Sequence, residues 1–429
     1  MNQLSTSLQK GKEYLWCLRE NWRMSRHEKS INQRIREKIS NHEKIRVVFV
    51  CHRPAVWGAL KTAYEAFARD PFFETLLVTV PQLDLIREDG SYDSAIDTFF
   101  ASYHPIRGYD QKTGSFLDLE TLAPDIVFFQ QPYDIMRPVC SYSDRVSAYA
   151  KIGYVCYFSA FSDELESDEA AGSCYPCGFF QHISYFFAQN ESEAQYVSQR
   201  FKPKPRQLKI LTTGYPKYDG LDQYIGSNSS VWSFPDAKNT FRILWTPRWT
   251  TNENNCHFFD YKDHWFDYCK EYPDTDFVFR PHPQAWLEWE KTGEFSPEAH
   301  EQLEECIAKT VNMNLDQSSE YLSTMYSSDV LVTDLSSLIL QYYLTEKPII
   351  FCYRENGRFG YSKDSMIGKS MYWAENWNEV NDYLTMLKEG RDPLKEFRKK
   401  VIRDIFKIDT VVPAGEKIKN AVKEDLGAL

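Results

Sequence analysis

The stretch Val330-Leu-Val-Thr-Asp-Leu-Ser-Ser-Leu-Ile-Leu340 predicts a buried strand over Val330–Thr333 that runs into Asp334, a possible N-cap, and a helix that begins near Ser336 and Ser337. Glu346-Lys-Pro-Ile-Ile-Phe-Cys352 follows it at the spacing of a second strand. A strand, a helix and a strand in this order usually place the two strands parallel in one sheet, with the helix covering a face. The fold class that this stretch indicates is therefore α/β.

The same alternation extends outward through the chain, where short apolar runs alternate with helical stretches, the pattern of mainly parallel sheets. In the first half the runs are Ile45–Val50, Thr75–Val80, Asp125–Phe129, Ile152–Tyr157 and Lys209–Thr212. In the second half they are Phe241–Trp245, Asp276–Phe279, Val311–Leu315, Val330–Thr333 and Pro348–Cys352. The sequence thus predicts two Rossmann-like, doubly wound domains that face a cleft.

The domain boundaries follow from a polar segment, Gly226–Ser230 with Pro235 beyond it, which is typical of a linker. We expect a basic amphipathic helical segment over residues 1–44, an N-terminal domain over 45–225 and a linker over 226–240. A C-terminal domain follows over 241–429 and ends in helices at Leu394–Phe406 and Gly415–Lys423.

Charge is distributed unevenly along the 429 residues, whose net charge is -11. Residues 1–46 hold eleven Lys or Arg and five Glu, a balance of +6, so the remainder carries -17. A general nucleic-acid binder needs a basic face, so we expect no nucleic-acid partner. Apolar residues recur at helical spacing in the basic segment, at Leu4, Leu8, Leu15, Leu18 and Trp22. This helix either lies on anionic lipid or packs against its own protein or a partner subunit.

The sequence predicts a cytoplasmic protein. No apolar run approaches the roughly 18 residues of a membrane span, and the N-terminus lacks the apolar core of a secretory signal. Only Cys174 and Cys177 form a CxxC pair, which lacks the second ligand pair of a zinc site, so we expect reduced structural thiols and no metal site. If the basic helix meets lipid, the protein is peripheral at the inner face of the membrane.

Polar side chains follow several predicted strands, at the edge where open parallel sheets bind ligands. Phe277-Val-Phe-Arg-Pro-His-Pro283 ends a strand in Arg280, a permanent cation that suits phosphate, and holds His282 between two prolines. Thr246 and Arg248 end another strand as candidate donor-binding residues, with Arg248 within reach of a phosphate. The helix start at Ser336 offers hydroxyls and amides to an anion. Taken singly, each motif also fits a structural turn or a capped helix.

In the N-terminal half, His52 follows the first predicted strand, and Asp134 lies in Gln130-Gln-Pro-Tyr-Asp134 after another. These positions suit an acceptor-side site, although a histidine at a strand end is often only structural.

Together the motifs of the second half resemble the CDP-glycerol glycerophosphotransferase family of teichoic-acid and related polymer synthesis. The matching stretches occur in the family's order over about residues 208–355: Gly214-Tyr-Pro, Leu244–Trp249, Arg280-Pro-His-Pro283, Thr333-Asp-Leu-Ser-Ser337 and Lys347-Pro-Ile-Ile-Phe351. The resemblance implies a GT-B fold with acceptor binding in the first domain and the CDP-activated donor in the second. It implies transfer of a polyol phosphate, glycerol phosphate above all, to a hydroxyl of a glycan or lipid-linked acceptor, with release of CMP.

The resemblance also implies roles for individual residues. Arg280 and His282 would lie at the donor phosphates, and His282 would bind phosphate or protonate the leaving group. The phosphate or glycerol end of the site would be formed by Thr333, Asp334, Ser336 and Ser337. The family's His-Gly-Thr motif, whose histidine is the proposed base, does not occur in this chain, so His52 and Asp134 are the candidate bases.

Two other functions fit the same sequence. One is a GT-B glycosyltransferase that uses a nucleotide sugar, because one fold hosts many donors. The other is a non-catalytic module that binds a nucleotide, which the missing base motif favours. No cofactor is required by these motifs, and they leave the use of a divalent metal open.

Overall fold

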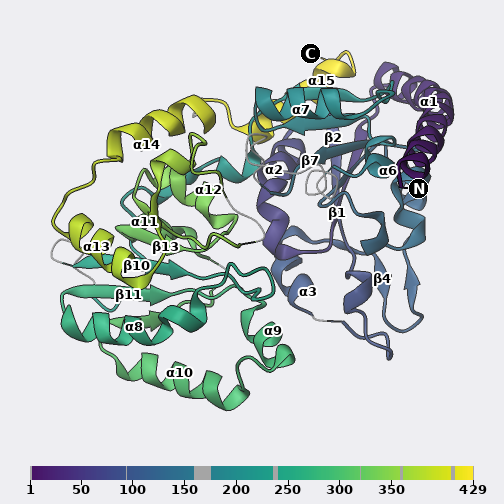
Figure 1. Ribbon diagram of the computed structural model, residues 1–429. Helices are drawn as coiled ribbons and strands as arrows, with labels where there is room; N and C mark the ends of the chain where they lie inside the picture. The colour runs from purple at the N-terminus through teal and green to yellow at the C-terminus, as the bar shows by residue number, and fades with distance from the viewer. Residues whose placement is uncertain are drawn as a thin grey trace. The chain divides into compact units, whose positions relative to one another are not determined.

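The computed structural model describes residues 2–92, 94–158, 175–234, 240–318, 320–357, 361–406 and 411–428 (Figure 1). The chain divides into two compact units. Unit 1 consists of Met1–Asp219 together with Ile408–Leu429, and unit 2 is Gly220–Lys407.

Unit 1 contains a seven-stranded sheet in the order β3-β2-β1-β6-β7-β8-β9, in which all paired neighbours are parallel. Its strands are β1 (Ile45–Cys51), β2 (Phe73–Thr79), β3 (Ile106–Arg107), β6 (Ile126–Phe129), β7 (Lys151–Val155), β8 (Tyr185–Ala188) and β9 (Lys209–Thr212). A small hairpin joins β4 (Tyr109–Asp110) to β5 (Ser115–Phe116). The chain starts at β1, moves to one edge and returns to β6, so the strand order reverses between β1 and β6.

Unit 2 repeats this order in a parallel six-stranded sheet, β12-β11-β10-β13-β14-β15. Its strands are β10 (Phe241–Thr246), β11 (Thr275–Phe279), β12 (Met313–Leu315), β13 (Val330–Thr333), β14 (Ile349–Cys352) and β15 (Tyr372–Ala374). Here the order reverses between β10 and β13. Both sheets therefore have the doubly wound arrangement that the alternating apolar runs predict. The short strands β3, β8 and β15 were not among the predicted strands.

Helices connect the parallel strands of both units. In unit 1 they are α2 (Lys61–Arg69), α3 (Ala95–Phe100), α4 (Ser143–Val146), α6 (Cys177–Phe180) and α7 (Glu191–Arg200). In unit 2 they are α8 (Phe258–Glu271), α9 (Ala285–Thr292), α10 (Pro297–Lys309), α11 (Leu322–Ser327) and α12 (Leu338–Tyr342), while α13 (Trp377–Lys388) and α14 (Lys395–Val401) follow the last strand. Because helices cover the sheets, the central strands are buried on both faces and their sequences are almost continuously apolar.

Aromatic packing fixes the first helix of unit 2 against its sheet. Phe258, at the start of α8, stacks on Trp245 of β10 with ring centroids 5.9 Å apart and on Trp289 of α9 at 4.3 Å. Each such ring pair adds about 0.5–1.5 kcal/mol to the area that it buries. The position of the loop between β10 and α8 is therefore set from both ends.

The N-terminal helix α1 (Asn2–Ser40) packs on unit 1 through a face that the predicted apolar stripe does not include. Cys17, Met24, Ile31 and Ile35 are buried, whereas Leu15, Leu18 and Trp22 of the predicted stripe are exposed. The side chains of Leu4 and Leu8 lie outside the described residues. Near its end, Lys38 forms an ion pair with the buried carboxylate of Asp125 at 2.6 Å. The helix thus belongs to unit 1 and does not form a separate segment over 1–44.

The C-terminal helix α15 (Ala414–Asp425) also lies in unit 1, which corrects the predicted 241–429 domain. Asp219 accepts hydrogen bonds from the backbone N–H of Ala414 at 2.7 Å and of Gly415 at 3.0 Å, and so caps the helix. A Cβ on Gly415 would come within 2.3 Å of the backbone of Thr62 on α2, so only glycine permits this approach. In Figure 1, α15 is the yellow helix beside the elements of unit 1.

The predicted linker over 226–240 is not a free connection between domains. In its described part, Trp232 is buried and donates from Nε1 to Ser327 Oγ at 2.7 Å, and the N–H of Phe234 donates to Asp276 at 2.9 Å. Residues 220–234 therefore pack as part of unit 2, and the boundary between the units lies at Asp219 and Gly220.

Burial of Glu193 predicts how the stability of unit 1 depends on pH. Its carboxyl accepts from Tyr175 OH at 2.9 Å and from the N–H of Gln189 at 2.7 Å, and burial raises its pKa from 4.5 to about 7. The folded state binds the carboxyl proton of Glu193 more tightly than the unfolded state does. The protonated side chain therefore adds to the free energy of unfolding below pH 4.5, and this stabilisation is lost as pH rises to 7. The loss is up to about 3 kcal/mol.

Replacement of Glu193 by Gln keeps the shape of the side chain and removes the titration. In urea unfolding between pH 5 and 8, we expect the wild-type free energy of unfolding to fall relative to that of Glu193→Gln as pH rises. Parallel pH profiles for the two proteins would contradict this assignment.

Candidate functional site

Several of the polar residues that the sequence singles out lie where the strand order of each sheet reverses, and Arg280 and His282 follow the adjacent strand β11. Ligands of doubly wound sheets bind at this place, beyond the carboxyl ends of the two strands that diverge. In unit 2 these strands are β10 and β13, followed by Thr246 to Arg248 and by Asp334. In unit 1 they are β1 and β6, followed by His52 and by Gln130 and Gln131.

Thr246 and Thr333 pair in register at the ends of β10 and β13. The hydroxyl of Thr246 donates to that of Thr333 at 2.7 Å, and the hydroxyl of Thr333 donates to the carbonyl of Thr246 at 2.8 Å. Both side chains are buried. Their contacts hold the two strand ends together, so the residues shape this edge of the sheet rather than present hydroxyls to a ligand.

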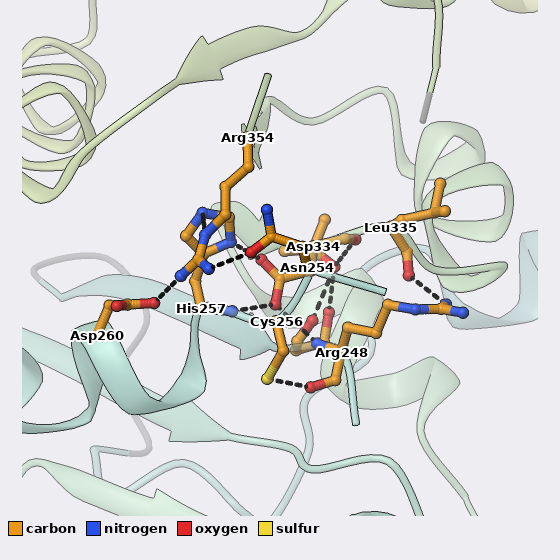
Figure 2. Close-up of polar contacts among 10 residues, drawn as sticks. Arg248, Asn254, Cys256, His257, Asp260, Asp334, Leu335 and Arg354 are labelled. Carbon is orange, nitrogen blue, oxygen red and sulfur yellow. Dashed lines mark hydrogen bonds and ion pairs between the residues drawn. The ribbon is translucent and has the colours of Figure 1, made fainter. Parts of the chain in front are cut away.

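Asp334 organises the loop that follows β10 (Figure 2). Its carboxylate, buried with the rest of the residue, accepts from the backbone N–H of Arg248 at 2.8 Å and of His257 at 2.9 Å. It also accepts from Nδ1 of the His257 ring at 2.6 Å. The carboxylate thus accepts three hydrogen bonds from one loop, and it anchors the residues between 248 and 257.

The two predicted phosphate-binding arginines already contact carboxylates. Arg280 forms an ion pair with the buried Asp316 at 2.7 Å, and its guanidinium lies over the ring of Tyr321. Arg248 pairs with Glu253 and donates to the carbonyl of Leu335 at 3.1 Å. Each arginine is at the predicted strand end, but each side chain is held by groups of the protein.

His282 is exposed at the end of β11, and its Nδ1 accepts from the N–H of Gln284 at 3.2 Å. Its ring stacks on Trp249 with centroids 5.2 Å apart. This contact brings together the motifs that follow β10 and β11. The imidazole is therefore oriented by a turn and an aromatic face while remaining accessible to a ligand.

The helix predicted to begin near Ser336 is short, since α12 covers Leu338–Tyr342. Ser336 Oγ accepts from the N–H of Leu338 at 3.1 Å, and Ser337 is exposed at the N-cap position. The two serines lie two and three residues beyond Asp334, at the same strand end.

Three residues of this edge were not found from the sequence: Asn254, His257 and Arg354. Arg354, which follows β14, donates from Nε to His257 Nε2 at 3.2 Å and from Nη1 to Asn254 at 2.9 Å, and it pairs with Asp260. Arg354 lies about a hundred residues away from Asn254 and His257 in the chain, and no local sequence pattern connects them. The one sequence signal was the position of Arg354 directly after a predicted strand.

In unit 1, His52 is buried beside Gln130 and Gln131. A hydrogen bond of 2.7 Å joins its Nε2 to Gln131 Oε1 and holds the ring in place. Gln130 Oε1 accepts from the backbone N–H of His52 at 2.7 Å and so fixes the loop after β1.

Asp134 is half-buried and lies at the end of a chain of hydrogen-bonded polar side chains that begins on α1. Its carboxylate accepts from Ser143 Oγ at 2.6 Å and pairs with Arg137, whose Nη1 donates to the carbonyl of Gln131 at 2.6 Å. Ser143 Oγ is also 3.1 Å from His182 Nδ1, and His182 Nε2 lies 3.4 Å from Glu20 of α1. Burial and the charge of Arg23 lower the pKa of His182.

These contacts link the two predicted bases indirectly. His52 meets the side chain of Gln131, whereas Asp134 reaches the same residue only through Arg137. Both oxygens of Asp134 are engaged with Ser143 and Arg137.

Within the described ranges, no group of three His, Cys, Asp or Glu side chains is placed to hold a metal ion. Cys174 of the CxxC pair lies outside these ranges. None of the described helices is long and apolar enough to cross a bilayer.

Residues 179–407, which contain all of unit 2, match the sequence profile of the family described as CDP-glycerol:poly(glycerophosphate) glycerophosphotransferase. The chain belongs to this family. The transferase matches no curated protein in sequence. The family predicted from the ordered motifs is confirmed.

The fold of the transferase is shared by solved structures of low sequence identity. The S. aureus MnaA–UDP co-structure has 13% identity and a TM-score of 0.59, and it covers 90% of this chain and 98% of its own. UDP-GlcNAc 2-epimerase from Neisseria meningitidis, bound to UDP-GlcNAc, has 14% identity, a TM-score of 0.53 and coverage of 90% and 100%. At such identities the likeness shows the fold alone, and it confirms the predicted GT-B class.

The ion pair of Arg280 predicts that this residue contributes to stability. Arg280→Ala leaves Asp316, which is buried, without a cationic partner, so we expect the free energy of unfolding to fall by about 3 kcal/mol in urea titrations. The double variant Arg280→Ala/Asp316→Asn removes the buried charge and is expected to recover part of this loss. An unchanged stability in Arg280→Ala would show that the pair is dispensable to the fold.

Proposed function

We propose that the transferase moves a polyol phosphate, glycerol phosphate above all, from a CDP-activated donor to a hydroxyl of a glycan or lipid-linked acceptor and releases CMP. The observation that carries the proposal is the family match over residues 179–407, which includes the whole edge where β10, β11, β13 and β14 end. The donor would bind at this edge of unit 2, and the acceptor at the edge of unit 1 that carries His52.

The reaction breaks the bond between the distal phosphorus and the oxygen that bridges it to CMP, and it forms a bond from the acceptor oxygen to that phosphorus. Such transfers depend on positioning and on the stabilisation of phosphate oxygens. His282 is exposed and oriented by Trp249, so it would contact the donor phosphates or protonate the departing CMP. His52 would accept the hydroxyl proton, and its bond to Gln131 would hold the imidazole in position.

The other predicted residues take supporting roles. Ser336 and Ser337 would contact the donor, while Thr246, Thr333 and Asp334 hold the strand ends and the loop that surround it. Arg248 and Arg280 would add positive potential while remaining paired with Glu253 and Asp316.

CMP release from CDP-glycerol and CDP-ribitol, measured with and without a lipid-linked glycan extract, tests this proposal. We expect acceptor-dependent release from one of the two donors and a fall in kcat of about 100-fold or more in His282→Ala, because a general acid or phosphate contact is lost. His264→Ala, an exposed histidine that stacks on Trp377 of α13, is the matched control and is expected to retain wild-type kcat.

Turnover with sugar nucleotides and none with CDP-polyols would instead support a glycosyltransferase. CDP binding without turnover across these acceptors would support a non-catalytic nucleotide-binding protein.

We also propose that α1 docks on an anionic membrane at the inner face, where a lipid-linked acceptor would be found. The exposed face of the helix carries Leu15 at 66% exposure and Trp22 at 57%, with Lys12, Arg19 and Arg26 beside them. Arg26 lies 3.5 Å above the Trp22 ring. Apolar and basic side chains on one exposed helical face suit insertion among acidic headgroups.

Vesicle sedimentation tests the docking face without removing the helix, whose other face is part of the core of unit 1. Leu15→Ser/Trp22→Ser is expected to weaken binding to vesicles containing phosphatidylglycerol at least tenfold, because each side chain loses about 1.5–3 kcal/mol of apolar burial. Wild-type binding should fall as salt rises. Leu287→Ser, an equally exposed leucine of unit 2, is the control, and equal binding by all three proteins would contradict the docking face.

A further inference from the structure

We propose that Arg354 binds the donor diphosphate and that His257, held by Asp334, is the positioning residue that orients it. This inference rests on the proposed function and extends it to residues outside the motifs that carry the family resemblance. Arg354 is a cation at the edge of unit 2, and a phosphate can replace its carboxylate partner Asp260.

The contact of Asp334 with the His257 ring determines the tautomer of that ring. Nδ1 lies 2.6 Å from Asp334 Oδ1, so Nδ1 carries the proton and donates it to the carboxylate. Nε2 is then an acceptor, and the Nε–H of Arg354 donates to it at 3.2 Å. Both His257 and Asp334 are buried, so the imidazole cannot turn away. The orientation of the guanidinium is therefore set by a carboxylate that it does not touch (Figure 2).

Arg354 spans the place where the strand order reverses. It follows β14, yet its guanidinium contacts Asn254 and His257 of the loop after β10, and β13 lies between these two strands in the sheet. A cation that crosses the ends of β14, β13 and β10 lies at the crevice where doubly wound sheets bind anionic ligands.

Its ion pair differs from those of the predicted arginines. The Arg280 side chain is 11% exposed and pairs with Asp316 at 3%, so separating them would leave a buried charge. The Arg354 side chain is 31% exposed and pairs with Asp260 at 48%. An exposed pair contributes little to stability because water screens it, so a diphosphate can replace Asp260 at small cost. The planar guanidinium also matches phosphate oxygens in geometry.

A purely structural clamp between β14 and α8 makes the opposite prediction for Asp260. If Arg354 only ties these elements together, loss of Asp260 weakens the fold and any ligand site that depends on it. If Asp260 instead holds the arginine until a phosphate arrives, its loss removes a competitor for the guanidinium and an adjacent negative charge.

Calorimetric titration of the full-length protein with CDP and with cytidine separates these possibilities. We expect Arg354→Gln to weaken CDP binding by about 10- to 100-fold, the effect of losing a charge-assisted hydrogen bond, and to leave cytidine binding unchanged. Asp260→Asn should bind CDP as tightly as the wild type or a few-fold more tightly. His257→Asn keeps a donor toward Asp334 but has no atom at the Nε2 position, so it should weaken CDP binding and spare cytidine.

Each result decides the inference. CDP binding that Arg354→Gln leaves unchanged, or CDP binding that Asp260→Asn weakens, would overturn it while leaving the proposed function intact. A wild-type protein that binds no CDP would overturn both. If Arg354→Gln does not fold, Arg354→Lys keeps the charge without the planar fork, and a wild-type affinity for CDP in this variant together with weaker binding in Asp260→Asn would equally overturn it.

Discussion

The buried carboxylate of Asp334 is the constraint on which the edge of unit 2 depends. At the point where the strand order reverses, neighbouring helices diverge and no connection fills the space beyond β10 and β13. The loop after β10 must then satisfy its backbone N–H groups in another way, and Asp334 accepts two of them. The same carboxylate fixes the His257 ring, so backbone conformation and side-chain chemistry have one common anchor.

The sequence predicted the sheets well because their signal is local. A buried parallel strand needs only a run such as Val330–Thr333, and the predicted and observed bounds of that strand and of β9 agree. The strands β8 and β15 were missed because β8 lies in a long aromatic stretch without clear ends and β15 has only three residues. The position of α15 could not be predicted, since it depends on Asp219 and on a backbone approach to Thr62, both far away in the chain.

The candidate site shows a similar division. The sequence placed Thr246, Arg248, Arg280, His282 and Asp334 at strand ends, and the structure has them there. The sequence could not show which groups of the protein each charged side chain contacts. Arg280 and Asp334 were expected to meet a ligand, yet their partners within the protein, Asp316 and His257, occupy them. Spacing in a sequence locates a charged group on an edge, but only the three-dimensional partners reveal whether it remains available.

The return of α15 to unit 1 also affects how the chain can fold during its synthesis. Unit 2, residues 220–407, is inserted between the two parts of unit 1. Helix α2 therefore cannot pack against α15 until all of unit 2 has been synthesised. At roughly 5–20 residues per second this interval is about 10–40 s. Meanwhile Asp219 has no helix to cap and the surface of α2 that receives Gly415 stays uncovered. Unit 1 is therefore completed only after all of unit 2 has been synthesised.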